Sequence, residues 1–302
     1  MTTAPTTPIF DDQILAGKRI LITGGGTGLG RGVARRLVQH GADVHIWGRR
    51  EAVLEAAAEE IAEGYPERAH HQVVDVRNAD TVDAAVADIW AHHGPLTGLV
   101  NNAAANFIAP TASLSPRGFE AIASTVMNGS FHATLACGRR WIDAGIPGSV
   151  VSTLTSWVWT GSPFVTPSAM AKAAVHAMTM SLAVEWGRYG IRLNAIAAGP
   201  IPTDYAWEML NPTAKSSVGA TQADQVPLGR FGTIDELANL NIFLLSDACH
   251  YLTGHTIAMD GGQHLAGPGT FAGLTSLTDQ DWENIRERSR AASDASKAQR
   301  TG

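Results

Sequence analysis

The chain has 302 residues, a hydrophobic content of 45%, which allows a sizeable core, and a formal net charge of −6 at pH 7. This mildly acidic balance argues against a nucleic-acid partner, because binding a phosphate backbone needs a basic face. No apolar run reaches the roughly 18 residues that a membrane span needs, so we expect no membrane-spanning helix.

Residues 1–16 are predicted to form a flexible arm, because they are rich in Thr and Pro and lack the basic and apolar stretches of a signal peptide. The two cysteines, Cys137 and Cys249, lie far apart in helix-like segments. Buried thiols are therefore expected in place of a disulfide, and a cytoplasmic location fits.

The first predicted strand is the short apolar run Lys18–Thr23, and the glycine-rich turn Gly24–Gly30 follows it. Residues 31–40 then show helical spacing. Glycines in this context bind phosphate, because they let the backbone approach a pyrophosphate and the helix N-terminus supplies free N–H groups and a positive dipole. A plain tight turn is the alternative, and the correct flanks on both sides disfavour it.

The second predicted strand, Val44–Trp47, ends at Gly48 and is followed by Arg49 and Arg50. An NAD-specific site would place Asp or Glu at this strand end to accept hydrogen bonds from the ribose hydroxyls. Guanidinium groups suit a 2′-phosphate, so the sequence predicts NADP(H). If the arginines only solvated the start of the next helix, residues 51–63, the missing acid would be unexplained.

The third predicted strand is Gln72–Val76, in which Asp75 is placed to cap an adenine, and a helix over 79–93 follows. Leu99–Val100 then leads into Asn101–Phe107. This segment ends a fourth strand, where an open parallel sheet places its ligand crevice.

Two pairs of adjacent histidines lie near the third strand and the helix over 79–93. They are His70 with His71 and His92 with His93. They lack the i, i+4 spacing and the acidic neighbours of a metal site. We therefore predict no metal site and expect exposed or loosely packed histidines.

Ser115 and Pro116 are predicted to open a long helix that carries Asn128, with proline at the first helical position. The fifth predicted strand, Gly148–Thr153, follows. An apolar helix over Val165–Tyr189 comes next, with Ser168 and Lys172 one turn apart on one face.

The sixth predicted strand is Ile191–Ile196, and residues 204–228 are expected to form a mobile substrate lid. A capping box at Thr233–Glu236 predicts a helix to about Ser246, and Thr256–Gly262 contains the last strand and a turn. Another helix is predicted to start at Thr278–Trp282.

Alternating strands and helices predict a Rossmann-type α/β fold, a doubly wound parallel sheet in a single domain. We expect the arm at 1–16, an NADP-binding reductase domain at 17–263 and an extension with a short helix at 264–302.

Over residues 17–263 the chain resembles the short-chain dehydrogenase/reductases, through Thr23–Gly30, Asn101-Asn102-Ala103, Asn128, Lys172 and Gly199-Pro200. It is similar in particular to the 2,4-dienoyl-CoA reductases, through Asn102-Ala103-Ala104, Asn106-Phe107-Ile108, Pro167–Lys172, Ala183–Gly187 and Gly199-Pro200-Ile201. That subfamily also has serine where other members of the family have the catalytic tyrosine, and here the serine is Ser168.

The resemblance implies a cofactor-binding set in which Gly24 to Leu29 hold the pyrophosphate, Arg49 the 2′-phosphate and Lys172 the nicotinamide ribose. The full set is Thr23, Gly24, Gly26, Thr27, Gly28, Leu29, Arg49, Asp75, Asn102, Lys172, Gly199, Pro200 and Ile201. The implied substrate contacts are Arg77, Asn106, Phe107 and Ser115, and the implied catalytic residues are Asn106, Asn128, Trp157, Ser168 and Lys172.

Asn106 corresponds to an asparagine that hydrogen-bonds the thioester carbonyl, which would stabilise charge developing on that oxygen. The departure from the subfamily is Trp157, which stands where these reductases keep a tyrosine acid. An indole N–H donates a hydrogen bond but has no accessible acidic proton. The tyrosines of the chain lie elsewhere, at Tyr65, Tyr189, Tyr205 and Tyr251. Of these, only Tyr205, in the expected lid, could reach the site.

These features predict an NADPH-dependent reductase of a conjugated acyl-CoA thioester, acting by hydride transfer and water-assisted protonation. The alternative is a catalytically weak or silent NADP(H)-binding homologue, and a ketone or alcohol dehydrogenase is a third hypothesis. The resemblance also implies a homotetramer formed through the helices at Phe119–Ala144 and Val165–Tyr189.

Overall fold

The computed structural model describes residues 10–106, 108–203, 223–267, 278–281, 283–285 and 287. The chain divides into two compact units, Met1–Gly262 and Gln263–Gly302. The second unit contains the short helix α10 (Gln263–Ala266) and a helix start at Thr278. There the backbone N–H of Thr278 donates to Asp281 at 2.9 Å and the N–H of Asp281 donates back to the Thr278 hydroxyl at 3.3 Å. Trp282 lies outside the described residues.

The first unit is built on a seven-stranded sheet with the order β3-β2-β1-β4-β5-β6-β7. Every neighbouring pair is parallel, which confirms the doubly wound fold. The strands are β1 (Arg19–Thr23), β2 (Asp43–Gly48), β3 (Ala69–Val73), β4 (Gly98–Asn101), β5 (Gly148–Thr155), β6 (Ile191–Ala198) and β7 (Thr256–Met259). The order reverses between β1 and β4, and a ligand crevice is expected outside the carboxyl ends of the strands at such a switch point.

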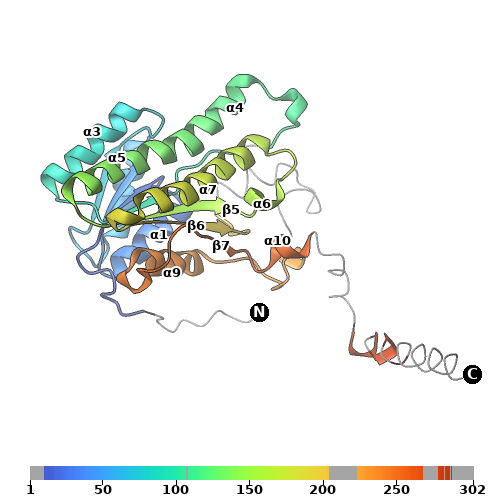
Figure 1. The fold of residues 1–302 in the computed structure, drawn as a ribbon. Coiled ribbons are helices and arrows are strands. Elements are labelled where there is room, and N and C mark those ends of the chain that lie inside the picture. Colours follow the sequence, from blue (N-terminus) through green and yellow to red (C-terminus); the bar gives the residue numbers. More distant parts are fainter. Residues whose placement is uncertain are drawn as a thin grey trace, which may run out of the picture. The chain divides into compact units, whose positions relative to one another are not determined.

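Helices cover both faces of this sheet (Figure 1). On one face lie α3 (Ala79–His92), α5 (Gly129–Ala144) and α7 (Thr166–Trp186), and on the other lie α1 (Gly28–Gln39) and α9 (Ile234–Leu245). The remaining helices are α2 (Glu51–Ile61), α4 (Pro116–Ala123) and α6 (Trp157–Thr160). No helix among the described residues is long and apolar enough to cross a membrane.

Each face of the sheet has its own core, and the strands alternate between the two. In β2, Val44 and Ile46 are buried in the core that includes residues of α1, α2 and α9. Trp47 points the other way and packs in the core that includes residues of α3 and α5. Successive side chains of a strand face opposite sides, so a strand covered on both faces buries side chains in both cores.

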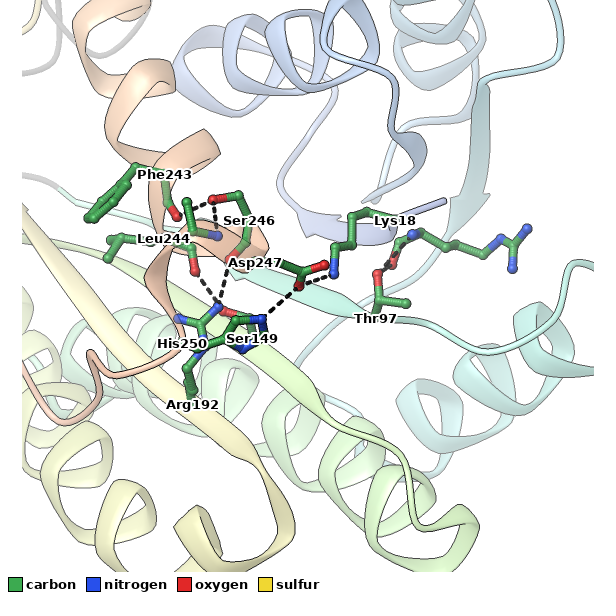
Figure 2. Close-up of polar contacts among 11 residues, drawn as sticks. Lys18, Thr97, Ser149, Arg192, Phe243, Leu244, Ser246, Asp247 and His250 are labelled. Atoms are coloured by element: carbon green, nitrogen blue, oxygen red, sulfur yellow. Dashed lines mark hydrogen bonds and ion pairs between the residues drawn. The ribbon is translucent and has the colours of Figure 1, made fainter. Parts of the chain in front are cut away.

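A polar network ties the C-terminal end of α9 to the strand starts (Figure 2). Arg192, at the start of β6, donates to the carbonyl of Ser246 at 3.2 Å, and Ser149 in β5 donates to the carbonyl of Leu244 at 2.9 Å. Lys18, just before β1, forms an ion pair with Asp247. These bonds lie near the amino ends of the strands, opposite to the carboxyl ends where a ligand crevice is expected.

The sequence prediction misplaced one strand and did not foresee a feature of one helix. The third strand spans Ala69–Val73, earlier than the predicted Gln72–Val76, because its register is set by β2, whose last residue Gly48 pairs with Val73. The predicted long helix is present, but a π-helical turn at Ser124–Asn128 separates α4 from α5.

Candidate active site

The glycine-rich turn after β1 is a tightly packed cradle at the start of α1. Gly28 has a φ of +53°, a conformation that favours glycine, and a Cβ on Gly30 would lie 2.3 Å from the carbonyl oxygen of Gly24. Thr27, the N-cap residue, makes no side-chain cap bond, and the first turn of α1 holds no acidic residue. The helix N-terminus therefore keeps backbone N–H groups and a positive dipole for an anionic ligand, as a dinucleotide pyrophosphate requires.

The end of β4 holds this turn in place. The Asn102 side chain donates to the carbonyls of Thr23 and Gly24, both at 3.2 Å. The Thr23 hydroxyl accepts the backbone N–H groups of Asn102 and Ala103, each at 3.0 Å. Asn102 and Thr23 thus act together by positioning the glycine turn.

The segment after β6, which begins at Gly199, also lies at the carboxyl ends of the strands. A Cβ on Gly199 would lie 2.6 Å from the Cα of Asp260, so only glycine fits there. The carbonyl of Pro200 accepts the N–H of Gly232 at 3.1 Å, and Ile201 is buried. The backbone at Gly199 and Pro200 is held close to the strand ends, where the resemblance implies contact with the nicotinamide side.

Three charged residues lie beyond the ends of β2 and β3. Arg49 is exposed, and the Arg77 guanidinium donates to the Asp75 carboxylate through Nε at 2.9 Å. This hydrogen bond from Arg77, helped by the charge of Arg49, holds the pKa of the Asp75 carboxyl below its ordinary value. Asp75 and Arg77, to which the resemblance gives separate ligands, are therefore paired with each other.

Lys172 is buried in α7, with 7% of its surface exposed. Its Nζ donates to the carbonyl of Thr153 at 2.8 Å, which fixes the ammonium near the carboxyl end of β5. Burial lowers the pKa of this ammonium from its ordinary value to about 8. Ser168, one turn earlier, is also buried, which confirms that the two residues share one helical face.

Asn128 ends the π-helical turn, which packs against α7. Its side chain is half-buried. Single π turns within α-helices are frequent at functional sites. The sequence reasoning predicted the helix and missed this turn, because nothing in local composition marks the insertion of one residue into a helical turn.

Several buried polar atoms around the ends of β4 and β5 have no hydrogen-bond partner. They are Oδ1 of Asn101, Oδ1 of Asn106 and Oγ1 of Thr155. An unpaired buried polar group is costly, and each one needs an explanation. These atoms are candidates for ligand contacts, and of the three the sequence reasoning singled out only Asn106 for a role in the site.

Trp157 is the first residue of α6, which follows β5 and packs against α7. Its side chain is half-buried. The neighbouring Trp159 is exposed and makes an edge contact with the ring of His176.

The described tyrosines lie away from Lys172. Tyr65 precedes β3 and Tyr251 precedes β7, so both are near strand starts. Tyr189 follows α7, 21 residues after Ser168 and so roughly 30 Å along the helix axis, and its hydroxyl accepts a bond from Arg188 at 2.7 Å. Tyr205 and residues 204–222 of the expected lid over 204–228 lie outside the described residues, as does Phe107.

Ser115 has a local structural role. Its hydroxyl caps α4 by accepting the N–H of Gly118 at 3.1 Å. The hydroxyl only accepts in this cap, so its own O–H donor remains available for a substrate contact.

The sheet, the glycine turn on an uncapped helix and the buried lysine together define a nicotinamide-dependent oxidoreductase. Residues 24–264 match the family described as Enoyl-(Acyl carrier protein) reductase. This chain belongs to the short-chain dehydrogenase/reductase family, as the resemblance implied.

Two relatives carry the names of dienoyl-CoA reductases. "Probable 2,4-dienoyl-CoA reductase 3" of Caenorhabditis elegans is 38% identical over 92% of this chain and 91% of its own length. A "Probable 2,4-dienoyl-CoA reductase" of Bacillus subtilis is 40% identical over 82% of this chain and 97% of its own length.

Solved structures show the same fold. A short-chain dehydrogenase from Bacillus anthracis is 43% identical with a TM-score of 0.74, over 82% of this chain and 96% of its own. A gluconate 5-dehydrogenase from Burkholderia cenocepacia, in complex with NADP and tartrate, is 32% identical with a TM-score of 0.77, over 83% of this chain and 97% of its own.

Proposed function

We propose that this chain is an NADPH-dependent reductase of a conjugated acyl-CoA thioester, similar to the 2,4-dienoyl-CoA reductases. The observation that carries the proposal is the place of the Asn106 amide beyond the end of β4, where its buried Oδ1 has no hydrogen-bond partner within the protein. The adjacent strand, β5, carries the carbonyl that binds the Lys172 ammonium. The Nδ2 group of the Asn106 amide is the donor that a thioester carbonyl would need, and the unpaired Oδ1 can accept a hydrogen bond from a hydroxyl or a water. The names of the two relatives support the same substrate class.

In this proposal each residue has a separate task. The glycine turn binds the pyrophosphate, Arg49 the 2′-phosphate and Lys172 the nicotinamide ribose. NADPH, when bound, supplies the hydride that adds to the far end of the conjugated chain. The Asn106 amide hydrogen-bonds the thioester carbonyl, on which negative charge then develops, and a preformed donor there lowers the barrier.

Protonation of the reduced substrate is assigned to a water molecule. The residues that would position it are Lys172, Ser168 and Asn128, since α7 carries the first two and the π turn that packs against α7 carries the third. Trp157 would contribute a hydrogen bond from its indole N–H but no proton.

One observation favours a second function, that of a weakly active or silent NADP(H)-binding homologue. None of the tyrosines within the described residues lies near Lys172. A ketone or alcohol dehydrogenase is disfavoured for the same reason, because in this family that chemistry depends directly on the tyrosine.

The proposal is tested by NADPH oxidation against 2,4-dienoyl-CoA, 2-enoyl-CoA and 3-ketoacyl-CoA thioesters. We expect turnover with the dienoyl-CoA substrate. Tight NADPH binding without turnover of any thioester would support the silent homologue.

The assignment of Arg49 to the 2′-phosphate predicts a specific loss in Arg49→Ala. Loss of a charge-assisted hydrogen bond is expected to raise the Kd for NADPH roughly 10–100-fold and to leave the Kd for NADH nearly unchanged. Arg50→Ala is the matched control, because Arg50 is equally exposed but is the N-cap residue of α2. Equal losses for both cofactors in Arg49→Ala, measured by titrating nicotinamide fluorescence, would contradict the assignment.

The lowered pKa of Lys172, about 8, predicts a pH limit on cofactor binding. The ammonium is charged below that pH and neutral above it, so the affinity for NADPH should fall by up to about tenfold between pH 7 and 9. Lys172→Met carries no titrating group there, and its weaker binding should not change between pH 7 and 9. A wild-type Kd that is constant over this range would refute the role given to the ammonium.

We also propose a homotetramer formed through the two long helices. Large apolar side chains are exposed on α5 and α7, among them Phe131, Met180 and Val184. A cytoplasmic location is proposed because the thiols of Cys137 and Cys249 are both free and buried.

A further inference from the structure

Three histidines from three elements meet on the α3 face of the sheet. His45 of β2 stands beside His70 of β3 in the strand register, and His93 follows the last residue of α3. The ring centroids are 4.7 Å apart for His45 and His70, 4.7 Å for His45 and His93, and 4.4 Å for His70 and His93. One nitrogen of each ring lies within 4.8 Å of the others. We call this group the histidine cluster.

The histidine cluster is separate from the candidate active site. His45 and His70 stand near the amino ends of their strands, and His93 is followed by the loop that enters β4. Lys172, Asn106 and the glycine turn are at the carboxyl ends of the strands. The histidine cluster therefore has no role in the proposed reduction.

The Nε2 atom of His45 is the observation that indicates a ligand. The side chain is 1% exposed, and this nitrogen has no hydrogen-bond partner. A buried imidazole nitrogen without a partner is costly and unusual, because nearly all such atoms are paired. Burial, followed by the charges of His70, His93 and Arg19, lowers the pKa of His45 to about 3, so the ring is neutral and keeps a lone pair.

The other two rings complete the requirements for binding. Burial also lowers the pKa of His70, whose ring is half-buried. His93 is exposed, which provides an entry path. Arg19 and Asp43 are the charged groups that act on these rings, and they pair with each other at 3.5 Å.

We propose that His45, His70 and His93 bind a divalent transition-metal ion such as Zn²⁺ or Co²⁺. Neutral imidazole is a common ligand for these ions, and three histidines leave a fourth position for water. Metal–nitrogen bonds of about 2.0–2.1 Å need the three nitrogens to approach within roughly 3.4 Å of one another. The rings of His45 and His70 are stacked, with 23° between their planes. The half-buried His70 ring must therefore turn as well as the exposed His93 ring, while the buried His45 stays in place. The bound ion would join β2, the edge strand β3 and α3, and so stabilise this end of the sheet.

The test uses the full chain without a histidine tag, treated with a chelator and then titrated with Co²⁺. One equivalent is expected to bind and to give the visible absorption bands of a low-coordinate Co²⁺–imidazole site. Zn²⁺ should displace it and raise the Tm by several degrees. His93→Ala should lose at least tenfold in affinity, and the same loss is expected for His70→Gln.

His92→Ala is the matched control, since His92 is the preceding residue and bonds to Asp88 outside the histidine cluster. It should bind Co²⁺ like the wild type. Because His93 is exposed, His93→Ala is expected to fold, and its circular dichroism without metal should match that of the wild type. The proposal is overturned if the wild type binds no Co²⁺, or if His93→Ala and His70→Gln retain its affinity and spectrum.

Discussion

Replacing Trp157 with tyrosine is expected to raise kcat for a 2,4-dienoyl-CoA substrate about 10²-fold or more. A positioned general acid typically contributes 10²–10⁴-fold, and an indole cannot act as one. Trp157 directly follows β5 and lies on α6 beside α7, the helix that carries Lys172. A phenol at this position would supply the proton donor that the resemblance implies here. The measurement is steady-state NADPH oxidation with both proteins at saturating substrate.

Two variants separate the acid from changes in packing. Trp159→Tyr makes the same substitution two residues later, at an exposed position, and should leave kcat unchanged. Trp157→Phe removes the indole N–H without adding an acid, so it should show no gain. A similar gain in Trp157→Phe would mean that the tryptophan only obstructs the pocket, and equal rates for Trp157→Tyr and the wild type would remove position 157 from the chemistry.

Replacing Lys172 with methionine is expected to lower kcat/KM about 10²–10³-fold, the usual cost of removing one preorganised charged donor from an active site. The ammonium is held by a 2.8 Å bond to the carbonyl of Thr153, so its position does not depend on the ligand. Methionine has a similar length and is apolar, and the buried position should accept it without unfolding. The measurement is kcat/KM for the dienoyl-CoA substrate, with the Kd for NADPH determined in parallel.

Lys18→Met provides the matched control for this loss. Lys18 forms its ion pair with Asp247 near the amino ends of the strands, at the end opposite to Lys172 (Figure 2). The pair is partly exposed. Such pairs contribute about 0–1 kcal/mol to stability, so the control should keep full activity. If Lys172→Met kept wild-type kcat/KM, the assignment of the active site to the carboxyl ends of the strands would fail.

The predicted fold agrees with the structure where the signal is local. The glycine turn, the capping box at Thr233 and Glu236, and the helix that carries Ser168 and Lys172 are all present. Each depends on residues a few positions apart in one element, whose spacing is visible in the sequence. The strand β3 was misplaced because its limits follow from pairing with β2, and Gln72–Val76 is the more apolar segment.

The histidines show the same limit more clearly. In the sequence, His70 is adjacent to His71 and His92 is adjacent to His93, and neither pair has the spacing of a metal site. The structure joins His70 and His93 to His45, which the sequence reasoning did not consider. Parallel pairing of β2 with β3 and the return of the chain through α3 produce this group, and neither follows from spacing along one element.

The sequence by itself determined the order of strands and helices, the glycine-rich turn after the first strand and the position of Lys172 on its helix. These depend on hydrophobic periodicity, backbone freedom at glycine and helical spacing, which act over short distances. Only the tertiary structure decided that Lys172 is buried with a pKa of about 8, that the Asn106 amide oxygen is unpaired and that three histidines meet. Burial and contact across elements depend on which surfaces pack together, and that is set by the whole chain.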